Sequence, residues 1–337
     1  MKRWVPGLVL GLSVVAGSAS AQTVSLRLSH WLPTAHPMHI ALSEWTQSLN
    51  KASEGAINVT IFHSEQIGKA FDHYDMVRDG IADVALINPG YQPGRFPVSS
   101  AAEMPFMIAD SVKGTIAVDK WYRKYAAAEM KDVVFCTAFL RPSAIFQSRT
   151  KPIRVPADIK GMRIRPPDGT VAALVTSLGG TNVQASAPES REVLERGVAD
   201  ATVFPWGSTV LFGVDKALKY HLDMPAEMGF FGLAINKGRY EKLNAAQKKA
   251  MDAHCTTEWA AKLDAPWSTF EDEGKAKIEA LAGHEIIKPT PEQVDLWRQS
   301  AKPLIEEWSK AATKAGVNAT QAFDELKALL AAEKAAL

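Results

Sequence analysis

The chain has 337 residues, of which 47% are hydrophobic, and 38 basic against 37 acidic side chains give a formal charge of +1. This length is enough for a large core and two domains, and the near-neutral charge argues against binding nucleic acid or anionic lipid by electrostatics. Two cysteines cannot form a disulfide-rich scaffold, so the fold must depend on a packed core.

The N-terminus has the pattern of a cleavable export signal. Lys2 and Arg3 supply positive charge, an apolar run follows over residues 5–16, and an Ala-Ser-Ala sequence ends just before Gln22. We therefore expect residues 1–21 to be a signal peptide that sends the chain to the periplasm. Its removal takes away two cations, so the formal charge changes from +1 to −1. Beyond it the sequence has no run of eighteen apolar residues, and we expect no stable membrane insertion.

The rest of the chain alternates between strand and helix patterns. Strands separated by helices predict an α/β fold with a mostly parallel sheet that is covered on both faces. Period-two alternation or β-forming composition predicts strands over residues 24–30, 57–62, 82–87, 133–139, 162–165, 201–204 and 229–236. Helical spacing predicts helices over residues 38–52, 72–80, 170–178 and 188–198, a long helix over 245–282 interrupted at Pro266, and a helical segment over 291–337.

The common signatures of catalysis are absent from the sequence. It contains no Gly-x-Ser-x-Gly elbow, no phosphate-binding Gly-x-x-x-x-Gly-Lys-Ser/Thr loop and no His-Glu-x-x-His. His36 and His39 could share a helical face, but no carboxylate or cysteine nearby completes a set of metal ligands. Cys136 and Cys255 could form a disulfide in an oxidising compartment, or they could be two small buried hydrophobes. We expect a binding protein without catalytic residues, metal or cofactor.

Six short stretches of the sequence form an ordered set of motifs. The central one is Pro156-Ala-Asp-Ile-Lys-Gly-Met-Arg-Ile-Arg-Pro. The others are the strand and loop from Leu26 to Pro37, Ile67-Gly68, Gly80-Ile-Ala-Asp-Val-Ala, Met104-Pro-Phe and Gly197-Val-Ala-Asp. In this order the six stretches resemble the solute receptors of tripartite ATP-independent periplasmic (TRAP) transporters, and the match spans nearly the whole mature chain.

This resemblance implies two α/β lobes joined by crossing strands, with a long helix spanning both and a ligand cleft between them. We expect residues 22–142 with 230–270 in lobe I, and residues 143–229 with 271–337 in lobe II. The chain should cross between the lobes near Pro142 and Phe230. The resemblance also implies a partner, a membrane permease of a small and a large subunit that is driven by an ion gradient. We expect the receptor itself to be a monomer.

The carboxylate-binding arginine of the family falls on Arg165. A planar guanidinium holds a carboxylate by two parallel charge-assisted hydrogen bonds, which lysine cannot reproduce. Pro166 and Pro167 limit the backbone directly after it. The alternative is an ordinary surface or interdomain ion pair, as for its neighbours Arg154 and Arg163.

Two departures from the family pattern bear on the ligand. Ile145, next to Phe146, stands where many members have a second arginine. Phe204, followed by Pro205 and Trp206, stands where sialate-binding members have an asparagine. These changes replace polar groups with aromatic area, so we expect an aromatic or apolar monocarboxylate rather than a sialic acid, sugar acid or small dicarboxylate. The alternative is that Phe146, Phe204 and Trp206 are core residues.

Loops after two predicted strands of the first lobe supply the remaining candidates for ligand contact. They are Trp31 and His36 after the first strand, and Asn88 and Tyr91 after residues 82–87; parallel strands bind ligands at their carboxyl ends. Two other functions remain open, namely a binding protein for another class of importer and a secreted enzyme that acts on small organic acids.

Overall fold

The computed structural model describes Met1 and residues 23–337, so the predicted export signal lies outside the described residues apart from Met1. A ten-stranded mixed sheet runs through the molecule in the order β2-β1-β3-β9-β4-β7-β5-β6, with β8 paired to β4 and β10 paired to β8. The α/β class is as predicted. Two of its central strands, β4 and β9, divide the sheet into two halves.

The first half is built from parallel strands, because β1 pairs in parallel with both β2 and β3. The alternation that predicted β1 is visible in its burial, with Leu26 and Leu28 buried and Arg27 between them exposed. The elements are β1 (Val24–Ser29), α1 (Pro37–Ala52), β2 (Ile57–Phe62), α2 (His73–Arg78), β3 (Val84–Ile87), α3 (Ser111–Tyr122) and α4 (Ala126–Glu129).

The two long strands correct the prediction of a mostly parallel sheet. β4 (Val133–Ser148) pairs in antiparallel fashion with β9 (Glu227–Asn236), with β7 and with β8, and β9 is antiparallel to β3. The predicted strand ended at Phe139, whereas β4 continues past Pro142. The pairing register shifts between Arg141 and Ala144, and such an irregularity accommodates a residue that cannot donate to the ladder.

The second half repeats the parallel pattern, with β5 between β6 and β7. Its elements are β5 (Arg163–Arg165), α5 (Gly169–Ser177), β6 (Thr181–Asn182), α6 (Ser190–Glu195), β7 (Ala201–Phe204), α7 (Trp206–Leu211), β8 (Tyr220–Leu222) and β10 (Glu285–Ile287).

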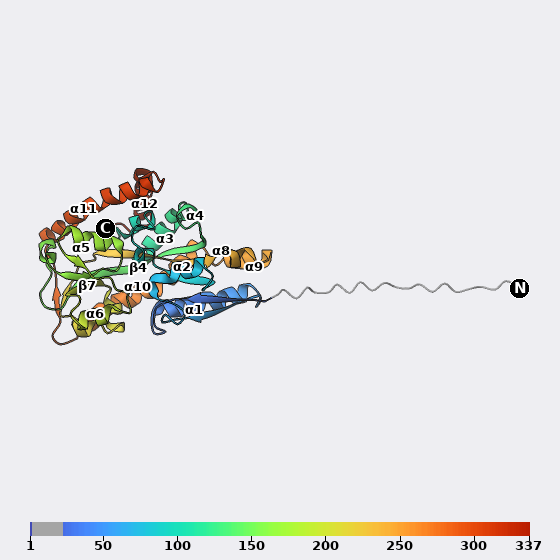
Figure 1. Ribbon diagram of the computed structural model, residues 1–337, viewed down its shortest axis with the longest axis horizontal. Helices are drawn as coiled ribbons and strands as arrows, with labels where there is room; N and C mark the ends of the chain where they lie inside the picture. Colours follow the sequence, from blue (N-terminus) through green and yellow to red (C-terminus); the bar gives the residue numbers. More distant parts are fainter. Residues whose placement is uncertain (2–22) are drawn as a thin grey trace.

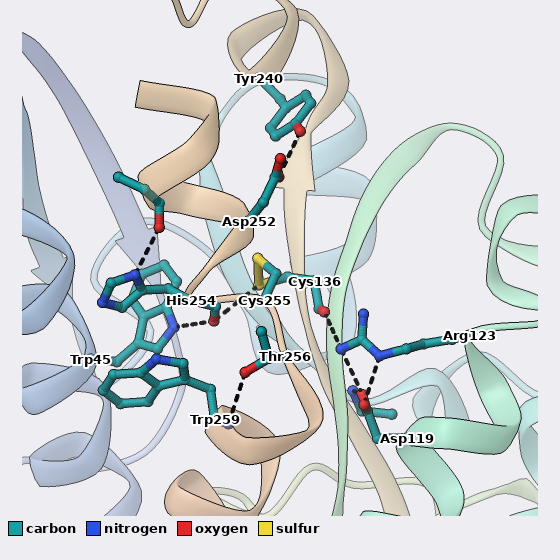
Figure 2. The surroundings of a disulfide bond; sticks show 12 residues. Trp45, Asp119, Arg123, Cys136, Tyr240, Asp252, His254, Cys255, Thr256 and Trp259 are labelled. Carbon is teal, nitrogen blue, oxygen red and sulfur yellow. Dashed lines mark hydrogen bonds and ion pairs between the residues drawn. A yellow bond between two sulfur atoms is a disulfide. The ribbon is translucent and has the colours of Figure 1, made fainter. Parts of the chain in front are cut away.

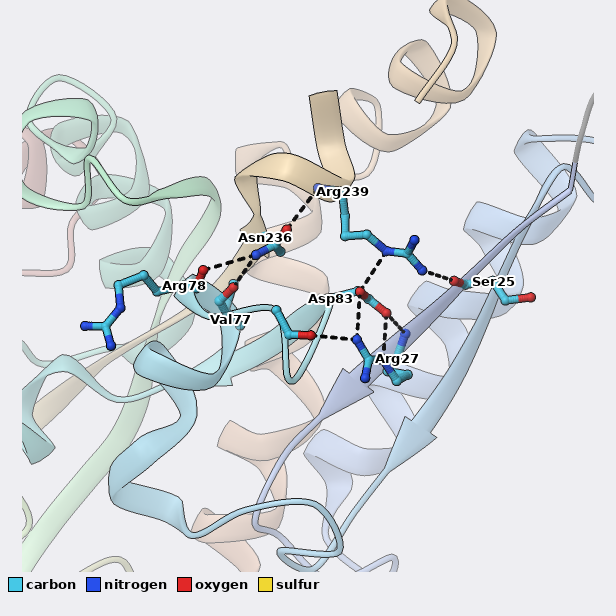
Figure 3. Close-up of polar contacts among 8 residues, drawn as sticks. Ser25, Arg27, Val77, Arg78, Asp83, Asn236 and Arg239 are labelled. Carbon is cyan, nitrogen blue, oxygen red and sulfur yellow. Dashed lines mark hydrogen bonds and ion pairs between the residues drawn. The ribbon is translucent and has the colours of Figure 1, made fainter. Parts of the chain in front are cut away.

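The two Gly-x-x-Asp motifs form the same contact in the two halves. In the first, Asp83 accepts hydrogen bonds from the backbone N–H of Arg27 at 2.8 Å and from its Nε at 3.0 Å, and Arg239 adds a bond from the other side (Figure 3). In the second, Asp200 accepts from the backbone N–H of Arg163 at 2.9 Å and from its Nε at 3.0 Å. Each aspartate thereby fixes the start of its strand against the neighbouring parallel strand.

The predicted long helix is two helices, α9 (Ala245–Asp252) and α10 (Thr257–Glu279), linked to β9 through α8 (Lys237–Glu241). The break lies before α10 and not at Pro266, which α10 includes. Two contacts explain it: the Thr256 side chain accepts a hydrogen bond from the N–H of Trp259 as an N-cap, and Cys255 is bonded to Cys136 of β4 with an S–S distance of 2.01 Å (Figure 2). The structure thus selects the disulfide from the two alternatives for the cysteines.

Helix α10 contacts α1 and α3 of the first half and α7 of the second, so it spans both. The approach to α7 is very close, because a Cβ atom on Gly274 would lie 2.1 Å from the backbone nitrogen of Gly207. Helices α11 (Pro291–Lys314) and α12 (Ala319–Ala332) lie on the outside of the molecule against α5 and α3 (Figure 1). Among the described residues, no helix is both long and apolar enough to cross a membrane.

Candidate functional site

A small cavity lies at the carboxyl ends of β1, β3, β5 and β7, between the two halves of the sheet. Its free volume is about 30 Å³. A benzene ring needs a cavity of roughly 150 Å³, so an aromatic ligand requires the walls of this cavity to move apart. It is lined by Trp31, Leu32, His36, Asn88, Tyr91, Arg141, Arg165, Pro167, Ala187, Phe204, Pro205, Ser208, Phe212, Phe231 and Trp267.

Arg165 ends β5 and forms no ion pair with a carboxylate in the part of the chain that the structure describes, although Tyr91 and Asp168 lie close enough to act on its charge. It is only 1% exposed, and its Nε donates to the carbonyl oxygen of Ala185 at 2.8 Å. Its Nη1 is buried and has no hydrogen-bond partner among the described residues. Burial lowers the pKa of Arg165, because the charged form is costly away from water. A bound carboxylate would supply both the missing acceptor and the missing counter-charge.

The other arginines named with Arg165 are paired within the protein. Arg163, two residues earlier on the same strand, is half exposed and bonds Asp200 at 2.6 Å. Arg154 is exposed and lies 3.3 Å from Glu285. The ion-pair alternative therefore describes these two arginines and not Arg165.

A second arginine, Arg141, also reaches the cavity. Its Nη2 donates to Glu227 Oε1 at 2.6 Å and its Nη1 donates to the Pro142 carbonyl at 2.9 Å. Asp168 lies at 4.0 Å. The charge of Arg141 is thus met by carboxylates of the protein.

Aromatic rings form most of the remaining wall. The ring of Trp31 lies 5.6 Å from Tyr91 and 5.7 Å from Phe231, centroid to centroid, and Phe231 meets Trp267 edge-on at 5.4 Å. On the other side, the Arg165 guanidinium lies 5.4 Å from the centroid of the Phe204 ring. The cavity therefore combines one available cation with a largely apolar, ring-lined surface.

His36 and Asn88 are uncharged polar side chains of the wall. His36 is fully buried and begins α1, where its Nδ1 accepts a hydrogen bond from the N–H of Met38 at 3.1 Å. Burial lowers the pKa of His36 to about 3, so the ring is neutral at physiological pH. Asn88 directly follows β3 and is 9% exposed.

Six of the eight predicted contact residues line this cavity: Trp31, His36, Asn88, Tyr91, Arg165 and Phe204. The other two lie elsewhere. Phe146 stacks on Trp297 in the core with the ring centroids 4.9 Å apart, and Trp206 packs with Ile145 and Ile278.

The pairing of β4 with β7 explains this difference. Ile145 is opposite Phe204 and Phe146 is opposite Val203, so Phe146 and Phe204 belong to opposite faces of the sheet. The structure thus replaces Phe146 and Trp206, as wall residues, by Phe212 of the loop after α7, Phe231 of β9 and Trp267 of α10. No sequence motif identified Phe212, Phe231 or Trp267 as candidates for ligand contact. The one indication for Trp267 was its position in the helix that was predicted to span both lobes.

The chain was compared with known proteins. Residues 28–311 match the family model DctP, described as bacterial extracellular solute-binding protein, family 7. A TRAP solute-binding protein of Rhodoferax ferrireducens, solved with benzoate, is 22% identical, has a TM-score of 0.87 and covers 93% of this chain and 99% of its own. This likeness confirms the predicted two-lobed fold.

Two further structures are 26% identical with TM-scores of 0.86. One is a marine metagenome TRAP solute-binding protein, described as specific for aromatic acids and solved with 3-hydroxybenzoate; the match covers 93% of this chain and 99% of that one. The other is a Bordetella bronchiseptica protein with bound (R)- and (S)-mandelate, with 92% and 99% covered. A Roseobacter denitrificans protein with bound β-D-glucuronate, 20% identical at a TM-score of 0.80, shares the fold.

Proposed function

Because this chain belongs to family 7 of the bacterial extracellular solute-binding proteins, which are the receptors of TRAP transporters, we propose that it captures an aromatic monocarboxylate for a two-subunit membrane permease. The family consists of binding proteins and not of enzymes. The observation that carries the ligand assignment is the buried Arg165, whose Nη1 has no hydrogen-bond partner among residues 23–337 and lies in a cavity walled by aromatic rings.

The charges around the cavity support one carboxylate rather than two. Arg141 is already paired with Glu227, so a second ligand carboxylate would have no free cation to meet it. An unpaired buried charge is costly, and a dicarboxylate would bring one into this cavity.

The composition of the wall supports a ring rather than a sugar. A sugar acid carries many hydroxyl groups, each of which requires a hydrogen-bond partner when it leaves water. Trp31, Tyr91, Phe204, Phe231 and Trp267 offer mainly ring faces and edges. The two neighbours at 26% identity hold aromatic acids, which agrees with this reasoning.

The route of the ligand is part of the same proposal. The predicted signal peptide over residues 1–21 would place the protein in the periplasm, where it would bind the acid and release it to the permease. Expression of the full chain, followed by N-terminal sequencing of the periplasmic product, tests the export step. A mature protein that begins at Gln22 supports it, and a chain that stays in the cytoplasm with its N-terminus intact contradicts it.

Thermal unfolding with a panel of acids tests the ligand class. Benzoate, mandelate and 3-hydroxybenzoate would be compared with glucuronate and succinate, and small molecules released by denaturing the purified protein would be identified by mass spectrometry. An aromatic acid at a hundredfold excess over its dissociation constant should stabilise the fold by about 2.7 kcal/mol. Stabilisation by glucuronate or succinate, without stabilisation by any of the aromatic acids, would contradict the proposal.

A further inference from the structure

Two polar atoms in the wall of the cavity remain without partners in addition to Arg165 Nη1. They are Nε2 of His36 and Oδ1 of Asn88, both buried and both without a hydrogen-bond partner in the part of the chain that the structure describes. Buried polar atoms in folded proteins are nearly always paired. Their presence in the same cavity as the unpaired arginine indicates that the ligand supplies the missing partners.

The structure fixes the role of His36. Its Nδ1 accepts the hydrogen bond from the N–H of Met38, so in the neutral ring Nδ1 carries no proton. The proton is then on Nε2, which can donate to a ligand in the cavity. Either a carboxylate oxygen or a hydroxyl oxygen can accept this bond.

Asn88 offers an acceptor to the ligand, whereas His36 offers a donor. Its Oδ1 is an acceptor, and it requires an O–H or N–H on the ligand. An ionised carboxylate has only acceptor atoms, and an unsubstituted ring has no polar hydrogen. The combination of Arg165, His36 and Asn88 therefore matches an acid that carries a donor in addition to its carboxylate.

We propose, on the basis of the proposed function, that the preferred ligand is a hydroxylated aromatic acid. Its carboxylate binds Arg165, its hydroxyl group donates to Oδ1 of Asn88, and one of its oxygen atoms accepts from Nε2 of His36. Asn88 is then the residue that distinguishes a hydroxy acid from the same acid without the hydroxyl group.

Matched pairs of acids test this proposal by calorimetry. Mandelate differs from phenylacetate, and 3-hydroxybenzoate from benzoate, by one hydroxyl group. The wild-type protein should bind the hydroxylated member of at least one pair about tenfold or more tightly, because the acid without it leaves Asn88 unpaired. The pair that shows the preference tells whether the hydroxyl group lies on the side chain or on the ring.

Two variants assign the preference to its residues. Asn88→Leu keeps the approximate size and removes the acceptor, so it should weaken the hydroxy acid and bring the affinity ratio of the pair to about one. His36→Asn keeps an N-cap acceptor for α1 and loses the ring donor, so it should weaken both members of the pair. Circular dichroism confirms that each variant is folded.

The outcomes separate this inference from the proposed function. If wild-type protein binds both members of both pairs equally well, the hydroxyl requirement is wrong and the aromatic-acid function stands. If the Asn88→Leu variant keeps the full preference for the hydroxylated acid, Asn88 is not the residue that binds the hydroxyl group. If no aromatic acid binds at all, the proposed function fails together with the inference. The wild-type comparison alone decides the first point, even where a variant does not fold.

Discussion

The hydroxyl group of Tyr91, in the first half of the chain, accepts a hydrogen bond of 3.0 Å from the backbone N–H of Ala187 in the second half. Both residues line the cavity, and the tyrosine is buried. The two halves are thus tied directly across the space where a ligand would lie. We expect this contact to hold the lobes closed and to be broken when they open about β4 and β9, near Pro142 and Phe230.

The Tyr91→Phe variant keeps the ring and removes this contact, together with the interaction of the hydroxyl group with Arg165. A typical hydrogen bond contributes roughly 0.5–1.5 kcal/mol, so ligand affinity should fall by about twofold to tenfold, mainly through faster dissociation. Calorimetry and stopped-flow measurements check this. X-ray scattering of the wild type should show compaction on binding, and identical curves with and without a tightly bound acid would contradict closure.

Phe204 and Trp206 form a matched pair for the role of the aromatic wall, since only Phe204 lines the cavity. Ring contacts contribute roughly 0.5–1.5 kcal/mol beyond buried area. Phe204→Leu should therefore weaken an aromatic acid by about threefold to tenfold more than a short aliphatic acid. Trp206→Phe should affect the unfolding temperature but not this ratio. Equal losses for both classes of acid in Phe204→Leu would show that this ring supports the fold and not the ligand.

The disulfide between Cys136 and Cys255 should contribute strongly to stability. It joins residues 119 positions apart, and closing a loop of this length in the unfolded chain is worth about 3–5 kcal/mol. The double variant Cys136→Ala, Cys255→Ala should unfold in urea with a free energy lower by that amount. A reducing agent should destabilise the wild type and leave the double variant unchanged. Equal sensitivity of both proteins to reductant would rule out this role.

A buried carboxyl group of α10 should make stability depend on pH. Burial raises the pKa of Asp264 to about 8, and the Thr115 hydroxyl group donates to its Oδ2 at 3.4 Å. Below pH 4 this carboxyl is protonated in the folded and the unfolded chain, so its stabilising contribution is complete. As the pH rises toward 8, the unfolded chain loses the proton and the folded chain keeps it, so the free energy of unfolding falls.

The Asp264→Asn variant cannot ionise and should lose this dependence. Between pH 5 and pH 8 its free energy of unfolding should fall less than that of the wild type, by on the order of 4 kcal/mol at about 1.4 kcal/mol per pKa unit. Urea unfolding at several pH values measures the difference, and other buried carboxyl groups cancel in the comparison. Parallel curves for the two proteins would contradict a neutral Asp264.

Local pattern and the family motifs were sufficient for much of the fold. The alternation in β1 and the β-forming residues of β7 predicted these strands, and Arg165 followed from the motif around it. The path of β4 past Pro142 could not be predicted, because a proline normally ends a central strand and the register shift that admits it depends on pairing with β9. Likewise, the helix break before α10 depends on the disulfide to Cys136 in β4.

The site was harder to predict, because the face to which a side chain points is set by strand pairing. From the sequence, Phe146 and Phe204 are equally good candidates for ligand contact. The register of β4 against β7 places them on opposite faces of the sheet. The state of Arg141 depends on Glu227, which is 86 residues away along the chain. No local pattern shows that Arg141 is already paired and that Arg165 is not.

The central claim is that Arg165 binds the ligand carboxylate, and Arg163 is its matched control on the same strand. Hydrogen bonds to charged groups are worth roughly 1.5–3 kcal/mol each, and removing the arginine leaves the carboxylate buried and unpaired. Arg165→Ala should therefore lose at least about 3 kcal/mol of binding, more than a hundredfold in affinity. Arg165→Lys should recover only part of this, because an ammonium group lacks the planar fork. Arg163→Ala, which removes an exposed pair with Asp200, should bind nearly as the wild type does.

Calorimetry of these four proteins with one aromatic acid is the most direct measurement, with circular dichroism to show that each is folded. The account predicts that binding is lost in Arg165→Ala, partly restored in Arg165→Lys and retained in Arg163→Ala. A folded Arg165→Ala protein that binds its acid within about threefold of the wild type would contradict the account.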